Sequence, residues 1–394
     1  SGQVRQGDRR RQAPLQRYSS MEPHVRAMGF SARRPPPAWL WHDARFAKLH
    51  PPARHTDIDD DDEEQTFAEF VEMGQRAPNA FGTGRIRLTP SRQTVRMLRL
   101  GNVSQTTVDG LAQIVSAYLC LPVDASEQPL ELVRNASRRG VSLIDARSGL
   151  EFPLQTRCNR HGKGRGARSA RSTPSIEVFS LFDVLVEYVR PSDASVVALV
   201  DAELHERIDD TVAEGDGGVS GAKRRRSWCA PVLGRACGDR VACVSARLEP
   251  VGVAPAHPTP LRSLVGTACH ELLHTLGVDH ATTARCVMNS QAAGDAEDEW
   301  LHLCPLNERK LLTALAEGGL LPVSHARMRT QHRADGGRSG GSNVNNYEPS
   351  AAASIARLAA LEAAYHEQGL IDDAQWAGDK RRVLVELVES LRAG

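Results

Sequence analysis

The chain has 394 residues, of which 41% are hydrophobic and 25% are charged, a balance that is typical of a globular protein and excludes a wholly disordered one. Lys and Arg number 49 and Asp and Glu 48, so no global field draws the chain onto nucleic acid or an anionic membrane. No apolar run approaches the length of a transmembrane helix. Because only 5% of residues are aromatic, we expect a core domain with unstructured segments around it.

Residues 1–91 are predicted to form a largely disordered N-terminal region. They hold little periodic hydrophobicity, and they include three consecutive prolines at 35–37 and an acidic block at 57–64. A run of like charges repels itself and stays solvated, so we interpret the block as a linker; binding of a basic partner or Ca²⁺ is the alternative. Residues 1–40 are rich in Arg and Pro and poor in acid, a composition that partly resembles a transit peptide, although we expect a plain disordered tail.

The first part of the expected core alternates strand and helix. Residues 95–100 predict a strand, and apolar residues then recur at helical spacing over 108–119. Two short strands are predicted at 130–133 and 141–144. Residues 157–172 interrupt this pattern with Gly and Arg, which is typical of a polar surface insertion.

The second part of the core is more apolar. Dense Val, Leu and Phe over 176–189 predict a buried helix, and the β-branched run 195–200 predicts a central strand. A second polar insertion is expected at about 212–240. Residues 241–248 predict a further strand, and prolines keep the chain extended until a helix begins near residue 261.

A last core helix at about 305–317 precedes a Gly/Ser-rich linker predicted at 323–349. Residues 350–394 are predicted to form a helical hairpin that either packs on the core or binds a protein partner. Its apolar positions are Ile355, Leu358, Leu361 and Tyr365 on the first helix, and Val383, Leu387, Val388 and Leu391 on the second.

The segment that carries chemistry is 270–280, which reads HELLHTLGVDH. His270 and His274 lie four residues apart on the predicted helix, so their rings project from one face and can chelate one metal ion. Gly277 tolerates the left-handed conformation that ends a helix and turns the chain. That turn can bring His280 back as a third ligand.

Three neutral imidazoles leave the fourth tetrahedral position of Zn²⁺ open, which is the arrangement of a catalytic rather than a structural site. Glu271 follows the first ligand, and we predict that it takes a proton from water at that position and passes it to the leaving amine. The prediction is therefore a metallopeptidase with one catalytic Zn²⁺. Two alternatives are histidines that only hydrogen-bond in the core, and a zinc site that no longer turns over.

The pattern resembles the zinc signature of the metzincin metallopeptidases, HExxHxxGxxH followed by a Met-turn. Met288 lies eight residues past His280, and such a Met forms a soft apolar floor under the histidines in that superfamily. The archaemetzincins are a closer match, since their motif adds Cys after the third His, Cys two residues before the Met, and a downstream CxxC. Cys286 and Cys304 match two of these four positions. The resemblance covers the domain predicted at 92–322.

The sequence departs from the archaemetzincin pattern at its second, structural zinc. Ala281 replaces the first of the four family cysteines, and Asn307 replaces the fourth. Two thiolates do not close a tetrahedral site, so we expect this zinc to be lost. A rebuilt site in which His302 joins Cys286 and Cys304 is the alternative.

The resemblance implies an α/β metzincin-like fold with a twisted mixed sheet, an active-site helix and a Met-turn. It also implies that an edge strand aligns an extended peptide or protein substrate, and residues 241–248 are our candidate for that strand. The Arg-rich stretches at 160–172 and 222–226 lack interleaved aromatics, so we expect no nucleic-acid binding; a nucleic-acid-associated protease is an alternative.

The eight cysteines are too sparse for a disulfide framework. We therefore expect an intracellular protein, in the cytoplasm or nucleus, with an organelle as the alternative. No membrane partner is expected. A zinc-binding interaction module without catalysis is the main rival to the peptidase hypothesis.

Overall fold

A computed structural model describes most of the chain. The described residues are 26–29, 64–76, 84–135, 140–158, 174–210, 226–238, 240–247, 260–289, 301–321, 326–329 and 346–393. The chain forms two compact units: the first unit holds residues 1–93, 113–121 and 276–394, and the second unit holds residues 94–112 and 122–275. Both Arg-rich stretches, apart from Arg226, and the acidic block up to residue 63 lie outside the described residues.

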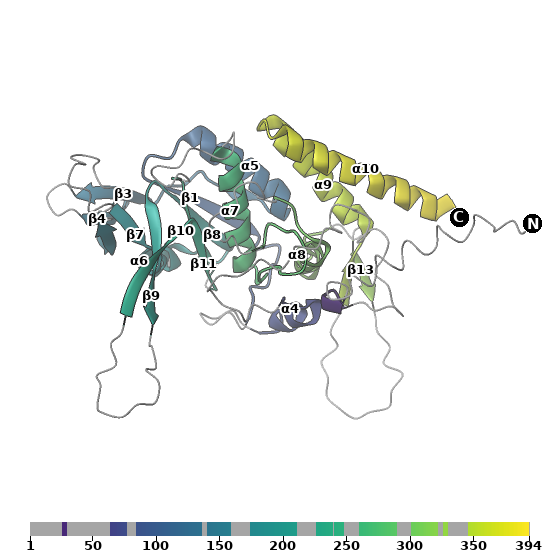
Figure 1. Cartoon of the computed structure of the whole chain (residues 1–394), viewed down its shortest axis with the longest axis horizontal. Helices are drawn as coiled ribbons and strands as arrows, with labels where there is room; N and C mark the ends of the chain where they lie inside the picture. Colours follow the sequence, from purple (N-terminus) through teal and green to yellow (C-terminus); the bar gives the residue numbers. More distant parts are fainter. Residues whose placement is uncertain are drawn as a thin grey trace, which may run out of the picture. The chain divides into compact units, whose positions relative to one another are not determined.

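The second unit is built on a five-stranded mixed sheet (Figure 1). Its strands, in spatial order, are β11 (Gly234–Cys237), β12 (Val241–Ser245), β8 (Asp193–Val200), β1 (Thr94–Leu100) and β2 (Val123–Asp124). All pairs are parallel except β11 with β12. Strand β8 is buried at every position and lies in the middle of the sheet, so the central strand predicted at 195–200 is confirmed.

The expectation that residues 241–248 form an edge strand is wrong. Strand β12 is paired on both sides, with β8 on one and with β11 on the other. The short β11 therefore forms this edge of the sheet in the described part of the chain. Sequence patterning missed β11 because its four residues lie inside the stretch 212–240, which reads as a polar insertion.

Two smaller sheets complete the second unit. One has the order β3 (Leu130–Asn135), β4 (Gly140–Asp145), β5 (Glu151–Leu154). The other has the order β10 (Arg226–Val232), β9 (Glu203–Asp210), β7 (Pro174–Glu177), β6 (Thr156–Cys158).

The helix predicted over 176–189 is shorter than expected. Ile176 pairs with Leu204 and Thr156 in the sheet, and helix α6 covers only Val178–Leu185 before a 3₁₀ turn. The Glu177 carboxylate accepts a hydrogen bond from the Ser180 amide at 2.7 Å and so caps α6. The apolar side chains of α6 then pack with strands β8 and β12 in one buried core.

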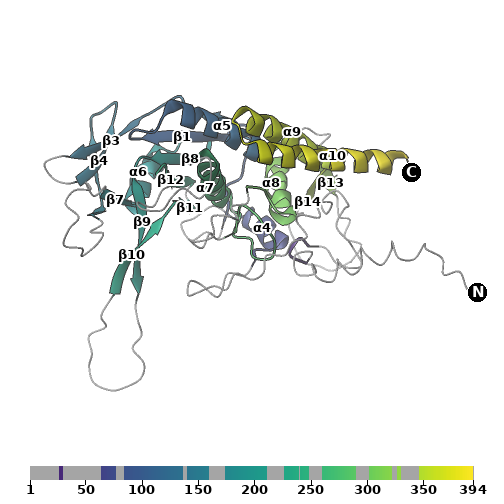
Figure 2. The same cartoon turned by 45° about the horizontal axis from the view of Figure 1, so that its top comes forward.

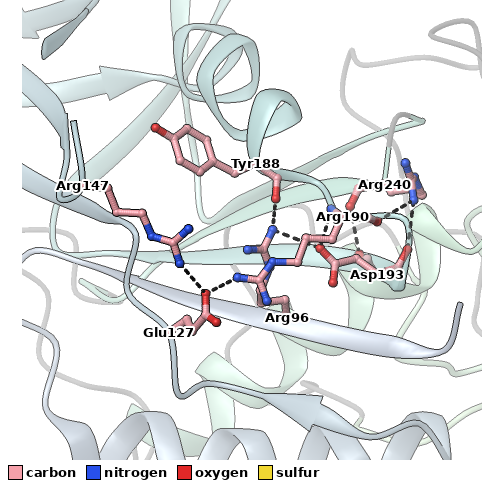
Figure 3. Close-up of polar contacts among 8 residues, drawn as sticks. Arg96, Glu127, Arg147, Tyr188, Arg190, Asp193 and Arg240 are labelled. Atoms are coloured by element: carbon pink, nitrogen blue, oxygen red, sulfur yellow. Dashed lines mark hydrogen bonds and ion pairs between the residues drawn. The ribbon is translucent and has the colours of Figure 1, made fainter. Parts of the chain in front are cut away.

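Buried charges tie together the starts of the parallel strands (Figure 3). Arg96 of β1 and Asp193 of β8 are both 2% exposed and lie 3.0 Å apart. Arg96 also donates to the Tyr188 carbonyl, and Arg240 donates to the Asp193 carbonyl at 3.0 Å, just before β12 begins. Removing one partner of a buried pair leaves an uncompensated charge, which costs about 3–5 kcal/mol, so this network holds β1, β8 and β12 in place.

The first unit is mainly helical. Its complete helices are α4 (Phe67–Met73), α8 (Pro305–Glu317), α9 (Ala351–Glu367) and α10 (Ile371–Ala393). It also holds the strand pair β13 (Ala326–Arg329) and β14 (Asn346–Pro349), while helix α5 (Gln105–Leu119) is divided between the two units. Helix α8 matches the predicted last core helix, whereas α4 was not predicted.

Helices α9 and α10 lie side by side, as Figure 2 shows, and both form hydrogen bonds with α8. Buried Glu308 of α8 accepts hydrogen bonds from Ser354 of α9 at 2.6 Å and from Lys380 of α10 at 3.0 Å. The hairpin is therefore anchored within its own unit.

The predicted apolar face of α10 is wrong at one position, because Val383 is 40% exposed whereas Leu384 is 1% exposed. Among the described helices, none combines the length and hydropathy that a bilayer span requires.

Candidate metal centre

Helix α7 (Pro260–Thr275) carries the first part of the motif. Its buried apolar side, which includes Val265, Ala268 and Leu272, packs on the main sheet of the second unit, beside β11, β12 and β8 (Figure 1). At its last turn, the Thr275 hydroxyl lies 2.8 Å from the Ser195 hydroxyl of β8. The helix is thus fixed against the sheet along its length.

His270 and His274 project from one face of α7. Their Nε2 atoms lie 3.0 Å apart, and the ring planes are 80° apart with centroids separated by 4.7 Å. His280 completes a group in which each ring offers one nitrogen and all three nitrogens lie within 4.8 Å of one another. In the part of the chain that the structure describes, no other three His, Cys, Asp or Glu side chains meet this distance.

Zinc fits this donor set. A tetrahedral ion with bonds of about 2.0–2.1 Å to imidazole holds its ligand nitrogens roughly 3.3 Å apart. The 3.0 Å separation and the 4.8 Å limit bracket that value. Neutral imidazole is also the nitrogen ligand that zinc prefers.

The chain turns between the second and third histidines at Gly277. This residue has a φ of 83°, in the left-handed region that disfavours side chains. A Cβ built at Gly277 would lie 2.5 Å from the Cβ of Arg85, which is closer than real Cβ atoms approach. Both the conformation and the lack of space require glycine here.

The segment after His280 folds back on itself through Met288. The Ala281 amide donates to the Met288 carbonyl at 2.8 Å. The Asn289 side chain donates to the carbonyls of Ala281 and Ala284 at 2.6 and 2.9 Å, and it accepts from the Cys286 amide at 2.7 Å. Met288 is fully buried. Sequence reasoning missed Asn289, although an Asn in a non-helical stretch is a general signal for such turns.

Glu271 lies between the histidine face and the edge strand β11. Its side chain is 8% exposed, and burial raises the pKa of its carboxyl to about 8; the charge of Arg235 lowers this pKa and that of Glu206 raises it. A Cβ built at Gly234 would lie 2.8 Å from the Glu271 Cγ, so only glycine allows this close approach. Gly234 and Arg235 were not predicted, because they lie within the stretch 212–240 that reads as a polar insertion. Glu206 was not predicted either, because no motif surrounds it.

The residues considered for a second zinc do not form a site of three ligands. Cys286 and Cys304 are buried together, and the Cys286 sulfur lies 3.2 Å from the Cys304 amide and 3.5 Å from the Asn307 side-chain nitrogen. Burial opposes ionisation of Cys286, but hydrogen bonds from Cys304, Met288 and Asn307 outweigh it and lower the pKa of this thiol.

His302 is directed elsewhere. Its ring stacks on Trp376 with centroids 3.3 Å apart, and its Nε2 lies 3.5 Å from an Asp373 oxygen, both on α10. His302 therefore contributes to the packing of the C-terminal hairpin. The two sulfurs and the Asn307 amide do not fit a structural zinc, which requires four ligands.

Three comparisons with known proteins give a distant structural likeness only. No family model matches the chain, and no curated protein matches it. Among solved structures, archaemetzincin from Methanopyrus kandleri is similar, with 18% identity and a TM-score of 0.34 over 58% of this chain and 97% of that one. A zinc-dependent peptidase from Methanocorpusculum labreanum has 16% identity and a TM-score of 0.34, over 55% of this chain and 99% of its own.

Archaemetzincin from Archaeoglobus fulgidus, in complex with malonate, has 15% identity and a TM-score of 0.32, over 55% of this chain and 99% of that one. These values are too low to transfer a function. A function for this chain is therefore inferred from its own residues.

Proposed function

We propose that this chain is a zinc-dependent peptidase whose metal is held by His270, His274 and His280. The observation that carries the proposal is that one nitrogen from each of three imidazoles lies within 4.8 Å of the others, while buried Glu271 follows His270 in helix α7. Zinc bound by three imidazoles polarises a carbonyl and acidifies water at its open position. The paired cysteines are not assigned a metal.

Glu271 is the proton carrier in this proposal. Glu271 follows His270 in helix α7, and its buried side chain lies against Gly234 of β11. Burial raises the pKa of this carboxyl, so Glu271 would act as a base only in its ionised form, which the positive charge of a bound Zn²⁺ would favour. Glu271 would therefore accept a proton from water and then deliver it to the amine that leaves the cleaved peptide.

The substrate, in this proposal, lies along β11 rather than β12. Strand β11 is the edge of the main sheet, and its Gly234 touches both Glu271 and Thr267 of α7. An extended peptide can add to such an edge through main-chain hydrogen bonds. These bonds form with many different peptide sequences, and they fix the position of the scissile bond along the strand. The substrate class is thus a peptide or protein in extended conformation.

The test is Glu271→Gln. This change keeps the size of the side chain and removes its capacity to accept a proton, so zinc content should be unchanged while hydrolysis of a diverse peptide library is lost. The matched control is Glu177→Gln, which makes the same change at a buried helix-capping residue of the second unit and should leave hydrolysis intact. Cleavage by the Glu271 variant at the parental rate would refute the mechanism. A zinc-loaded parent that cleaves nothing would favour an interaction module.

A further inference from the structure

The turn that carries His280 is held by a residue far away in the sequence. Gln65 lies 212 residues before Gly277, within a region that the sequence predicted to be largely disordered. Its side chain is nevertheless 6% exposed, and both residues belong to the first unit. A buried polar side chain outside any regular element requires partners, and the partners show what it holds.

Both ends of the Gln65 amide are used. The side-chain nitrogen donates to the Gly277 carbonyl at 3.1 Å, and the side-chain oxygen accepts from the Asp279 amide at 3.4 Å. Gly277 lies two residues after the end of α7, and Asp279 immediately precedes His280. The Gln65 amide gives the Gly277 carbonyl a partner beyond the helix while bridging the turn.

Residues near Gln65 contact its side chain or the segment beyond the turn. Its nitrogen also lies 3.0 Å from the sulfur of Met73 in α4, and neighbouring Glu64 accepts a hydrogen bond from Thr283, beyond the turn. Helix α4 starts directly afterwards with a capping box between Thr66 and Glu69, which stabilises its first turn.

Arg85 supports the same turn from another direction. Its Nε donates to the Phe70 carbonyl at 3.2 Å, and its guanidinium lies 4.4 Å from the centre of the Phe70 ring. Its side chain fills the space in which a Cβ at Gly277 would lie. Gln65 and Arg85 thus both contact the turn, the first through its side-chain amide and the second by packing.

We propose that Gln65 is a positioning residue for the third metal ligand. By bridging Gly277 and Asp279, it sets the path of the turn and hence the place from which the His280 ring reaches the metal. Groups that orient ligands typically change metal affinity tenfold to a hundredfold when they are removed. This inference rests on the metal site of the proposed function, but not on peptidase activity.

The test measures metal binding in the full-length protein. In Gln65→Ala, we expect affinity for zinc, from competition with a chromophoric chelator, to fall by about tenfold to a hundredfold. The visible spectrum of the Co²⁺-loaded variant should also change, because it reports the number and geometry of the ligands. Gln65→Glu keeps the acceptor for the Asp279 amide and loses the donor to the Gly277 carbonyl. Its affinity for zinc should therefore lie between that of the parent and that of Gln65→Ala.

The matched control is Thr66→Ala, which removes the cap of α4 at a cost of about 1 kcal/mol but leaves Gln65 in place. It should lower stability without changing zinc affinity or the Co²⁺ spectrum. Parental affinity in Gln65→Ala would overturn the inference, as would equal weakening in both alanine variants, which would indicate a general effect on folding. A parent that binds no metal would instead refute the proposed function.

Discussion

The two parts of the candidate metal centre are built in different ways. His270 and His274 come from a regular helix, α7, whose periodicity alone places them on one face and whose other face is packed on the main sheet. His280 comes from an irregular turn whose contacts are made by Gln65, Arg85 and Asn289, none of which belongs to the motif. A helix specifies side-chain positions locally, whereas a turn without regular hydrogen bonds depends on long-range contacts.

The two parts of the site should therefore be sensitive to different substitutions. Substitutions on the helix should act only when they remove a ligand or displace Glu271. Substitutions that affect the turn should act from distant positions in the sequence. Three further variants test this difference, beginning with the largest expected effect.

Removing a helical ligand should abolish metal binding. We expect one zinc per chain in the parent and none in His274→Ala, because two imidazoles do not retain zinc against buffer and chelator. Elemental analysis of protein purified without added metal provides the measurement. His205→Ala is the matched control, since His205 is also buried in the second unit but lies 2.9 Å from the Ser175 hydroxyl, away from the motif. Zinc retained in His274→Ala would exclude the three-histidine site.

Displacing Glu271 without touching a ligand should separate catalysis from binding. In Gly234→Ala the new methyl group would lie 2.8 Å from the Glu271 Cγ, so the carboxylate must move. Misplacement of a catalytic group by about 1 Å can reduce a rate a hundredfold, so we expect kcat to fall by about tenfold to a hundredfold with zinc content unchanged.

Gly149→Ala serves as a control for Gly234→Ala, because a Cβ at Gly149 meets nothing within 4 Å. It should lower stability slightly through its φ of 71° and leave kcat unchanged. An unchanged kcat in Gly234→Ala would mean that β11 does not confine Glu271.

Replacing the glycine of the turn should have a measurable but smaller effect. Gly277→Ala combines a φ of 83° with a 2.5 Å approach to Arg85, and we expect it to lower both zinc affinity and the free energy of unfolding. Gly319→Ala is the matched control in the same unit, since its φ is 68° and its Cβ meets nothing within 4 Å.

Gly319→Ala measures the effect of the left-handed conformation alone, which lowers stability by about 1–2 kcal/mol for a residue with a side chain. In denaturant unfolding of the zinc-free proteins, Gly277→Ala should have a lower free energy of unfolding than Gly319→Ala. Only Gly277→Ala should weaken zinc binding. Equal effects of the two variants would show that the contact with Arg85 is unimportant.

Regular elements with strong apolar patterns were predictable. Strand β8 and helix α8 have apolar patterns long enough to indicate their type. Helix α4 and strand β11 were missed because they have seven and four residues, and short elements carry too little periodicity to be recognised. Residues 241–248 were assigned to an edge because strand order in a sheet depends on which segment pairs beyond it, and β11 was the unseen partner.

The sequence alone was enough to identify the residues that could hold a metal ion, since the spacing of His270 and His274 on a helix follows from backbone geometry. It also determined that the chain must turn at Gly277, where a residue without a side chain follows the helix. Three contacts became visible only in the folded chain: Gln65 bridges that turn, Gly234 lies against Glu271, and His302 stacks on Trp376. The physical reason is that these contacts join segments far apart in the chain, and no local pattern encodes which distant side chain satisfies a given carbonyl or fills a given space.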